Sequence, residues 1–386
     1  MSDSTIDNAQ LTTSENSPQF LLRAIDWLAY AQYENGGWGA DQHLGNQLHN
    51  ASIDPATTAF SAMALMRAGN TLQSGKYSKQ VRLALDQLLS LIEGSQNNKY
   101  NITNERDTQP QRKLGQNIDV AMASQFLTKI RTGIQDKQLA DRVDKAIEEC
   151  IVKIEQAQNA NGSSQDGGWA PVLQSAMAVN ALELAEVRGY KVDGVKIANA
   201  KRYQKAHATM SGSAAPADAA GIPLYALASA QRATAGDASV VESTVAQNVL
   251  MDAEQSPNDL NEVVVRELIK KGKGKEEAEQ LAESYIASRA ATKRLEDDAV
   301  WRGFGNNGGE EFLSYMMTSE SMVQQGQNAW IRWYEKIARN FESIQNGDGS
   351  WSGHHCITSP VFCTAAVILS LTAGEDPDLI AVANGR

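Results

Sequence analysis

The chain has 386 residues, of which 42% are hydrophobic, and a net charge of -11. The negative charge argues against binding of nucleic acid or of anionic lipid, which needs a basic surface, and no apolar run reaches the roughly 18–20 residues of a membrane span. The three cysteines are an odd, sparse set that favours a reducing compartment. Residues 1–16 are polar, lack signal-peptide features and are expected to form a disordered leader. We therefore expect a cytoplasmic protein.

Helix–loop–helix units then follow one another along residues 17–386. In the first unit, apolar residues spaced along one helical face predict a helix at 17–33. A second helix is predicted at 55–68, with Asp54 as N-cap and Pro55 in the first turn. Further helices are predicted at 78–91, 117–131, 139–157, 171–187, 192–207, 217–232, 276–295 and 310–324, and on both sides of the loop within 340–372.

Two segments depart from this regular order. Pro223 lies inside the predicted helix 217–232 and indicates either a kink or a later helix start. Residues 234–275 are longer than a connection between units requires, and they are predicted to be a helical insertion with helices at 238–252 and 260–271. The rest of 17–386 is predicted to be a single domain.

The two helices of each unit differ in composition. The second ones, such as ATTAFSAMALM and FCTAAVILSL, are apolar nearly all round, which is typical of buried helices. The first ones carry a charged face. This difference predicts an inner and an outer ring of helices. The predicted fold is an all-α (α/α)6 toroid of six helical hairpins, in which the first and last units are in contact.

A short motif recurs in the loops between the paired helices. It reads Gln32…Gly37-Trp38, Gln158…Gly168-Trp169 and Gln345…Gly349-Ser350-Trp351. This pattern resembles the repeat of squalene and oxidosqualene cyclases and of protein prenyltransferase β subunits, and it covers most of the chain. The resemblance implies the α-toroid fold of the terpenoid cyclase and prenyltransferase superfamily, a central cavity and an apolar, isoprenoid-like substrate. The tryptophans are expected to stack at the turns between repeats.

The motifs that carry chemistry in those families are missing from this sequence. It has neither a DxDD acid motif nor a DDxxD diphosphate motif, and the nearest acidic string is Glu296-Asp297-Asp298. It also lacks the Asp-x-Cys zinc ligands of prenyltransferases. The resemblance therefore concerns the scaffold, and any active site has to be argued from other residues.

Histidines gather in the loops of the first and last units, which a closed toroid makes neighbours. Imidazole combined with thiolate or carboxylate is the usual ligand set of zinc, so a zinc site at this rim is one hypothesis. Histidine chemistry without a metal is a second hypothesis, and a surface or capping role is a third. The candidate ligands are His43, His49, His354, His355 and Cys356.

Acidic residues recur at the starts of the predicted inner helices. They act either as helix caps, which the helix dipole favours, or as general acids at the mouth of the cavity. The candidates are Glu310, Glu311, Asp54 and Asp119. Aromatic residues on the same helices either line the cavity, where their faces can stabilise cations, or belong to the core. These residues are Phe60, Phe126, Tyr225, Phe312, Tyr315 and Phe362.

Three functions follow as hypotheses. The first is a terpenoid-cyclase-like or prenyltransferase-like enzyme that acts on an apolar substrate by acid–base or zinc-assisted chemistry. The second is a zinc-dependent enzyme that modifies thiols or peptides, as lanthionine cyclases do. The third is a non-catalytic toroid that binds a peptide or a glycan, and beside these three stands a carbohydrate-active (α/α)6 barrel, because paired carboxylates also serve glycoside chemistry. A small apolar molecule or a peptide is the expected partner, and zinc is the one cofactor considered.

Overall fold

The structure is a computed structural model of the chain. It describes residues 17–40, 51–95, 97–208, 217–254, 259–303 and 308–379. These residues form helices and loops, and the extended pairing among them is limited to a β-bridge between Gln158 and Ser164. The prediction of an all-α protein is confirmed. Within the same ranges, no helix is both long and apolar enough to cross a membrane.

Most helices follow one another in pairs, close to the predicted positions. The pairs are α1 (Gln19–Tyr30) and α2 (Pro55–Arg67), α3 (Ser78–Gly94) and α5 (Ile118–Arg131), α6 (Lys137–Ala157) and α7 (Pro171–Val187), α8 (Gly194–Ala208) and α9 (Pro223–Thr244), α12 (Lys275–Leu295) and α14 (Gly309–Gln324), and α15 (Gln327–Ser343) and α16 (Pro360–Leu371). The connections hold short elements that the sequence did not predict. These are α4 (Gln109–Leu114), α13 (Asp298–Trp301) and, after the last pair, η2 (Ala373–Glu375), whereas η1 (Ala217–Ala219) is a short 3-10 turn inside the predicted helix 217–232.

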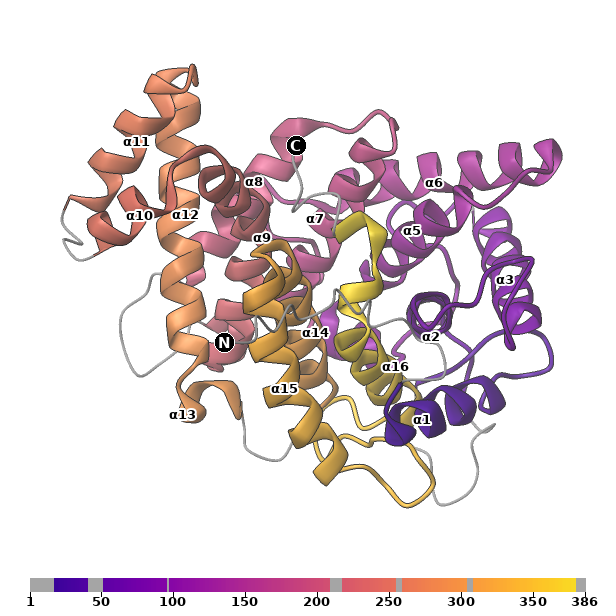
Figure 1. Cartoon of the computed structure of the whole chain (residues 1–386). Helices are drawn as coiled ribbons and strands as arrows, with labels where there is room; N and C mark the ends of the chain where they lie inside the picture. Colours follow the sequence, from indigo (N-terminus) through magenta and orange to yellow (C-terminus); the bar gives the residue numbers. More distant parts are fainter. Residues whose placement is uncertain are drawn as a thin grey trace.

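The second helices of the pairs contact one another in cyclic order. α2 packs against α5, α5 against α7, α7 against α9, α9 against α14, α14 against α16, and α16 against α2. We refer to these six as the inner helices. Figure 1 shows them in the middle of the molecule, with α1, α3, α6 and α12 toward its edge.

Composition explains which helices are inner. Every residue of α2 from Pro55 to Leu65 is buried, and so is every residue of α16 from Val361 to Leu371. Both helices are rich in alanine and other small side chains, which allow close approach of neighbouring helices on all sides. In α6, by contrast, the buried residues recur every three or four positions, among them Val143, Ile147 and Cys150. Such a helix buries one face and leaves the other to solvent.

Local signals set where several inner helices begin. The Asp54 carboxylate accepts a hydrogen bond from the Thr57 N–H at 2.7 Å, and Pro55 is the first helical residue, as predicted. Pro223 marks a later start and not a kink, because proline needs no N–H donor in a first helical turn. The predicted helix 217–232 is therefore wrong at its start. It is also wrong at its end, because α9 continues to Thr244.

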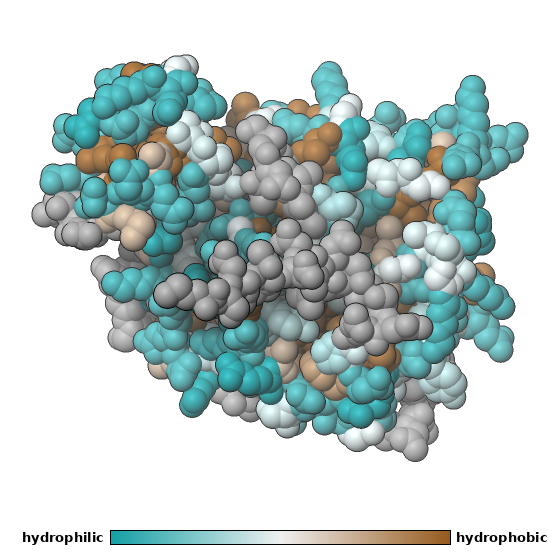
Figure 2. Space-filling model, viewed as in Figure 1, coloured by the Kyte–Doolittle hydropathy of each residue, from teal (hydrophilic) through white to brown (hydrophobic). Residues whose placement is uncertain are grey.

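The region predicted as an insertion contains α10 (Gln247–Glu254) and α11 (Leu260–Lys270), which pack beside α12 at one edge of the molecule (Figure 1). The predicted helix 260–271 is confirmed, whereas the predicted helix 238–252 is divided between the end of α9 and α10. Val241, Val264 and Tyr285 belong to a hydrophobic cluster separate from the main core. Figure 2 shows apolar residues gathered on this part of the surface.

The three glutamines of the repeated motif link the first, third and last pairs of helices to the pairs that follow them. Gln32 Nε2 donates to the Gln80 carbonyl at 2.9 Å, and Gln158 Nε2 donates to the Lys196 carbonyl at 2.8 Å. Gln345 Nε2 donates to the Phe20 carbonyl at 2.8 Å, which joins the last pair to the first. Each acceptor lies in the first turn of the next pair's first helix. The amide thus fixes the spacing between neighbouring pairs.

Two of the three motif tryptophans are structural, as expected. The indole N–H groups of Trp38 and Trp351 each donate to a carbonyl of the preceding helix, those of Leu28 and Phe341, at 2.9 Å. Both side chains are almost fully buried. Trp169 differs, because its side chain is 54% exposed and Lys113 Nζ lies 5.3 Å from the centre of its ring.

Replacing the last motif glutamine tests this linkage. In Gln345→Leu, the carbonyls of Phe20 and Gly349 both lose the amide donor. We expect the free energy of unfolding to fall by about 1–3 kcal/mol in urea denaturation. The matched control is Gln73→Leu, since Gln73 donates one exposed hydrogen bond to Gly133 and should matter little. Equal stability of the two variants would contradict the proposed role.

Candidate active site

The four predicted catalytic acids lie at the starts of inner helices and have no exposed surface. Asp54 caps α2, Asp119 lies in the first turn of α5, and Glu310 and Glu311 lie in the first turn of α14. The starts of α2 and α5 are in contact, because Asp119 Oδ1 accepts from the Ala56 N–H at 3.0 Å. The structure thus places these acids at the N-terminal ends of the inner helices.

Asp54 and Asp119 are hydrogen-bonded through both of their carboxylate oxygens. Asp54 accepts from the N–H groups of Ala40 and Thr57, and Asp119 accepts from the side chains of Asn101 and Gln111 in addition to Ala56. Burial, together with the neighbouring Asp119 charge, raises the pKa of Asp54 to about 7. Burial also raises the pKa of Asp119. Their hydrogen bonds join the first two units, so we interpret both residues as structural.

Glu310 is different, because half of its carboxyl group lacks a partner. Its Oε2 accepts from the Ile357 N–H at 3.1 Å. Its Oε1 is buried and has no hydrogen-bond partner among the described residues. Burial, aided by the charge of Glu311, raises the pKa of Glu310 to about 7, against the opposing effect of the Ile357 hydrogen bond. A carboxyl group with such a pKa and a free oxygen is suited to proton transfer near neutral pH.

The loop before α16 holds Glu310 in this position. The Gly309 N–H donates to the Ile357 carbonyl at 2.8 Å, while the Ile357 N–H donates to Glu310. A Cβ atom on Gly309 would lie 2.6 Å from the Ile357 Cβ, so a glycine is required for this close approach. Cys356 has a φ of 55°, a left-handed conformation that is unfavourable for a cysteine. The chain reverses there so that the Ile357 N–H faces the carboxyl group.

Other titratable side chains surround this carboxyl group. Burial and the Glu310 charge raise the pKa of the half-exposed Cys356 thiol to about 11, while the Lys113 charge opposes that rise. The pKa of Tyr225 is raised by burial and by the charges of Glu311, Glu310 and Cys356. The thiol and the phenol therefore stay protonated at neutral pH. Glu310 is the group among them that exchanges its proton there.

The histidines are divided between this site and its surroundings. His355 Nε2 lies 3.3 Å from Glu311 Oε1, and its side chain is 21% exposed. His354 is exposed, and His43 and His49 lie outside the described residues. Within the described ranges, no three His, Cys, Asp or Glu side chains are grouped as a metal site requires. The zinc hypothesis, which includes His43 and His49, stays a prediction.

The predicted cavity aromatics are all buried, but they do not surround one space. Phe60 and Phe362 face each other, with ring centres 4.9 Å apart, and Phe362 also lies against Gly309 next to Glu310. Phe312 and Tyr315 pack instead on Phe341 of α15. Phe126 and Tyr225 are fully buried on α5 and α9. Phe362 lies beside Gly309, and Tyr225, whose pKa is raised by burial, is close enough to Glu310 and Glu311 for their charges to raise it further.

The sequence prediction missed the contribution of α4. Gln109 Oε1 accepts from the N–H groups of Thr358 and Ser359, both at 3.1 Å, which connects α4 to the start of α16. Lys113, on the same helix, is the cation near Cys356 and Glu310. The available signal was Thr108 followed by Pro110, an N-cap and a first-turn proline inside the segment interpreted as a polar loop.

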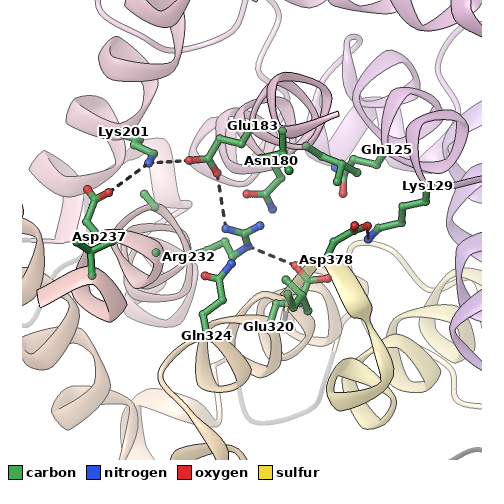
Figure 3. A pocket seen from close by; sticks show the side chains of 16 residues that line it. Gln125, Lys129, Asn180, Glu183, Lys201, Arg232, Asp237, Glu320, Gln324 and Asp378 are labelled. Carbon is green, nitrogen blue, oxygen red and sulfur yellow. Dashed lines mark hydrogen bonds and ion pairs between the residues drawn. The ribbon is translucent and has the colours of Figure 1, made fainter. Parts of the chain in front are cut away.

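A second site lies farther along the inner helices, toward their C-terminal ends. A pocket of about 200 Å³ is lined by polar residues of α5, α7, α8, α9 and α14 (Figure 3). Sequence reasoning missed this pocket. The signal for it was the presence of single polar residues, such as Asn180 and Gln324, in helices that are otherwise apolar.

Ion pairs beside this pocket connect the C-terminal segment to three inner helices. Asp376 lies 2.5 Å from Arg67 of α2 and 2.8 Å from Lys129 of α5, and Arg67 also lies 2.8 Å from Glu320 of α14. Although burial opposes it, the charges of Lys129 and Arg67 lower the pKa of Asp376. Both acidic partners, Asp376 and Glu320, are buried.

Comparison with known proteins finds no family model that matches this chain and no curated protein with significant similarity to it.

The raised pKa of Glu310 predicts a change in stability with pH. The folded protein keeps the Glu310 proton up to pH about 7, whereas the unfolded chain releases it near pH 4.3. The folded state therefore loses stability as pH rises from about 4.3 to 7. Glu310→Gln should remove this loss and be the more stable protein at pH 8, measured by urea denaturation at several pH values. A variant less stable than the parent at pH 8 would contradict this account.

Asp376 predicts the opposite behaviour. Asp376→Asn leaves Arg67 and Lys129 buried without their shared carboxylate, and we expect a loss of about 3–5 kcal/mol at pH 7. Because the pKa of Asp376 is lowered, its contribution is present above pH about 4 and is lost in more acidic solution. The loss should therefore shrink below pH 4. Asp26→Asn is the control, because Asp26 pairs with Lys76 at the exposed surface and should change little.

Proposed function

We propose that the chain folds as an (α/α)6 toroid of six helical hairpins. The cyclic contacts of the inner helices support this assignment, as does the hydrogen bond from Gln345 to Phe20 between the last and first pairs. The repeated glutamine–glycine–tryptophan motif, which resembles that of terpenoid cyclases and prenyltransferases, supports it independently.

We further propose that the protein is an enzyme that performs acid–base chemistry on an apolar, isoprenoid-like substrate, with Glu310 as the acid. One observation carries this proposal: a buried carboxyl group with a pKa of about 7 has one oxygen without a hydrogen-bond partner among the described residues. A protein gains no stability from such a group, since a buried polar atom without a partner is costly. Groups of this kind are concentrated at functional sites.

The surroundings of Glu310 favour an apolar substrate. The protonated carboxyl group would donate its proton to a double bond, and the carboxylate that remains would accept a proton when the product forms. Phe60 and Phe362 pack on each other, and Phe362 lies against Gly309 beside Glu310, so these rings would supply apolar surface next to the acid. The protonated Tyr225 and Cys356 leave Glu310 as the group that exchanges a proton at neutral pH.

The test is turnover of squalene and of farnesyl diphosphate, followed by gas chromatography and mass spectrometry. We expect products with the parent protein and a rate lower by on the order of 10²–10⁴ in Glu310→Gln. Because the acid must be protonated, the rate should fall as pH rises through about 7. The surface variant Asp26→Asn controls for handling of the protein. Unchanged turnover in Glu310→Gln, or no turnover of either compound by the parent, would overturn the proposal.

Zinc-assisted chemistry is the second mechanism for the same end of the inner helices. It is supported by His355 beside Glu311 and by the neighbouring Cys356, which are two of the residue types that bind zinc. Elemental analysis of the parent protein and of a His354→Ala/His355→Ala variant distinguishes the two mechanisms. About one zinc ion per chain that is lost in the variant would favour the zinc mechanism, and no zinc in either protein would exclude it.

A further inference from the structure

The pocket toward the C-terminal ends of the inner helices is separate from the Glu310 site. Its lining residues come from the later part of α5, α7 and α14, from the middle of α9 and from Lys201 of α8, with Asp378 and Leu379 closing one side. Glu310 is in the first turn of α14, whereas Gln324, its last residue, lines this pocket. The function of the pocket can therefore be considered independently of the proposed acid–base reaction.

The charges around the pocket are paired among themselves. Lys201 lies 2.6 Å from Glu183, and Arg232 lies 3.7 Å from Glu183 and 3.4 Å from Glu320. Lys129 is paired with Asp376 and Asp378, at 2.8 and 3.0 Å. The lining contains three cations and four carboxylates. The carboxylates would repel an anionic ligand, and the cations would repel a cationic one. An uncharged ligand therefore fits this pocket best.

The pocket also contains amide groups without partners. Both the Nδ2 and the Oδ1 of Asn180 are buried and make no hydrogen bond with described residues, and the same holds for Gln324 Oε1. Each of these two side chains is only 3% exposed. Figure 3 shows the Asn180 amide turned toward Arg232, with Gln324 on the other side of the guanidinium group. The pocket thus offers one unused donor group and two unused acceptors close together.

The volume of the pocket and its apolar surface limit the kinds of ligand that it can hold. A volume of about 200 Å³ corresponds to roughly seven water molecules at about 30 Å³ each, which suits a compound of one ring. Leu184, Val187 and Ala233 add aliphatic surface on which carbon-bound hydrogens can pack. A ligand with several hydroxyl groups matches the unused donors and acceptors, because each hydroxyl both donates and accepts.

We propose that this pocket binds a small, uncharged polyhydroxyl compound, a monosaccharide or a cyclic polyol. Asn180 hydrogen-bonds its hydroxyl groups through both amide atoms, and Gln324 accepts from a further hydroxyl. The paired charges of Arg232, Glu183 and Glu320 form a polar wall that orients the ring without requiring a charged group on it.

Isothermal titration calorimetry of the full-length protein tests this proposal. The probes are D-glucose, D-galactose and myo-inositol, with glucose 6-phosphate and glucosamine as anionic and cationic counterparts. We expect at least one neutral probe to bind, and its charged counterparts to bind at least tenfold more weakly. Asn180→Leu and Gln324→Met, which keep side-chain size but lack the unpaired groups, should each weaken binding by about tenfold or more. Glu310→Gln should bind like the parent, which separates this proposal from the acid–base reaction.

Stability of the unliganded variants provides the second measurement. If the amides bind a ligand, their replacement should leave the thermal midpoint of the free protein unchanged or higher. The reason is that a buried polar group without a hydrogen-bond partner destabilises the fold, and each substitution removes such a group. A lower midpoint in both variants would show that the amides are held by water as part of the fold, and would overturn the proposal. Absence of binding by all three neutral probes, or tighter binding of a charged probe, would also overturn it.

Discussion

The side-chain amide of a glutamine just after a helix joins neighbouring helical pairs at three of their junctions. Gln32, Gln158 and Gln345 each donate to a carbonyl in the first turn of the following pair. The last of these bonds reaches Phe20, so it joins residues more than 300 positions apart. Since a displaced pair would leave a carbonyl and an amide unmatched, the spacing of the pairs is fixed. The inner helices then come into cyclic contact.

This arrangement brings the N-terminal ends of inner helices together, where the helix dipole favours carboxylates. Asp54 is the N-cap of α2, and Asp119 and Glu310 are the second residues of α5 and α14, yet their roles differ. The two aspartates are hydrogen-bonded through both oxygens, whereas one Glu310 oxygen is left without a partner. The cause is local: after the reversal at Cys356, the Ile357 N–H donates to one oxygen of Glu310. The two structural aspartates and the candidate catalytic Glu310 thus differ in how many hydrogen-bond donors reach their carboxylate oxygens.

The C-terminal ends follow the complementary rule, because the dipole there favours cations. Arg67 and Lys129 lie in the last turns of α2 and α5, and Asp376 of the C-terminal segment pairs with both. These charged groups are paired with one another. Among the described residues that line the neighbouring pocket, the buried side-chain atoms without a hydrogen-bond partner belong to the neutral amides of Asn180 and Gln324. One end of the inner helices thus holds an ionisable carboxyl group, and the other holds neutral hydrogen-bonding groups.

The sequence by itself determined the helices and which of them are buried, because periodicity, prolines and N-caps act within one or two turns. The starts of α2 and α7 and the extent of α11 are examples. Contacts between distant residues decided the rest. The position of α4 depends on the hydrogen bond between the side chains of Gln109 and Thr358. The hydrogen bonding of Glu310 depends on the loop that ends at Ile357, whose N–H donates to one carboxylate oxygen. The pocket at Asn180 is formed by residues of five helices together. Only the tertiary structure decides these features, because no local pattern specifies which groups remain without a partner after folding.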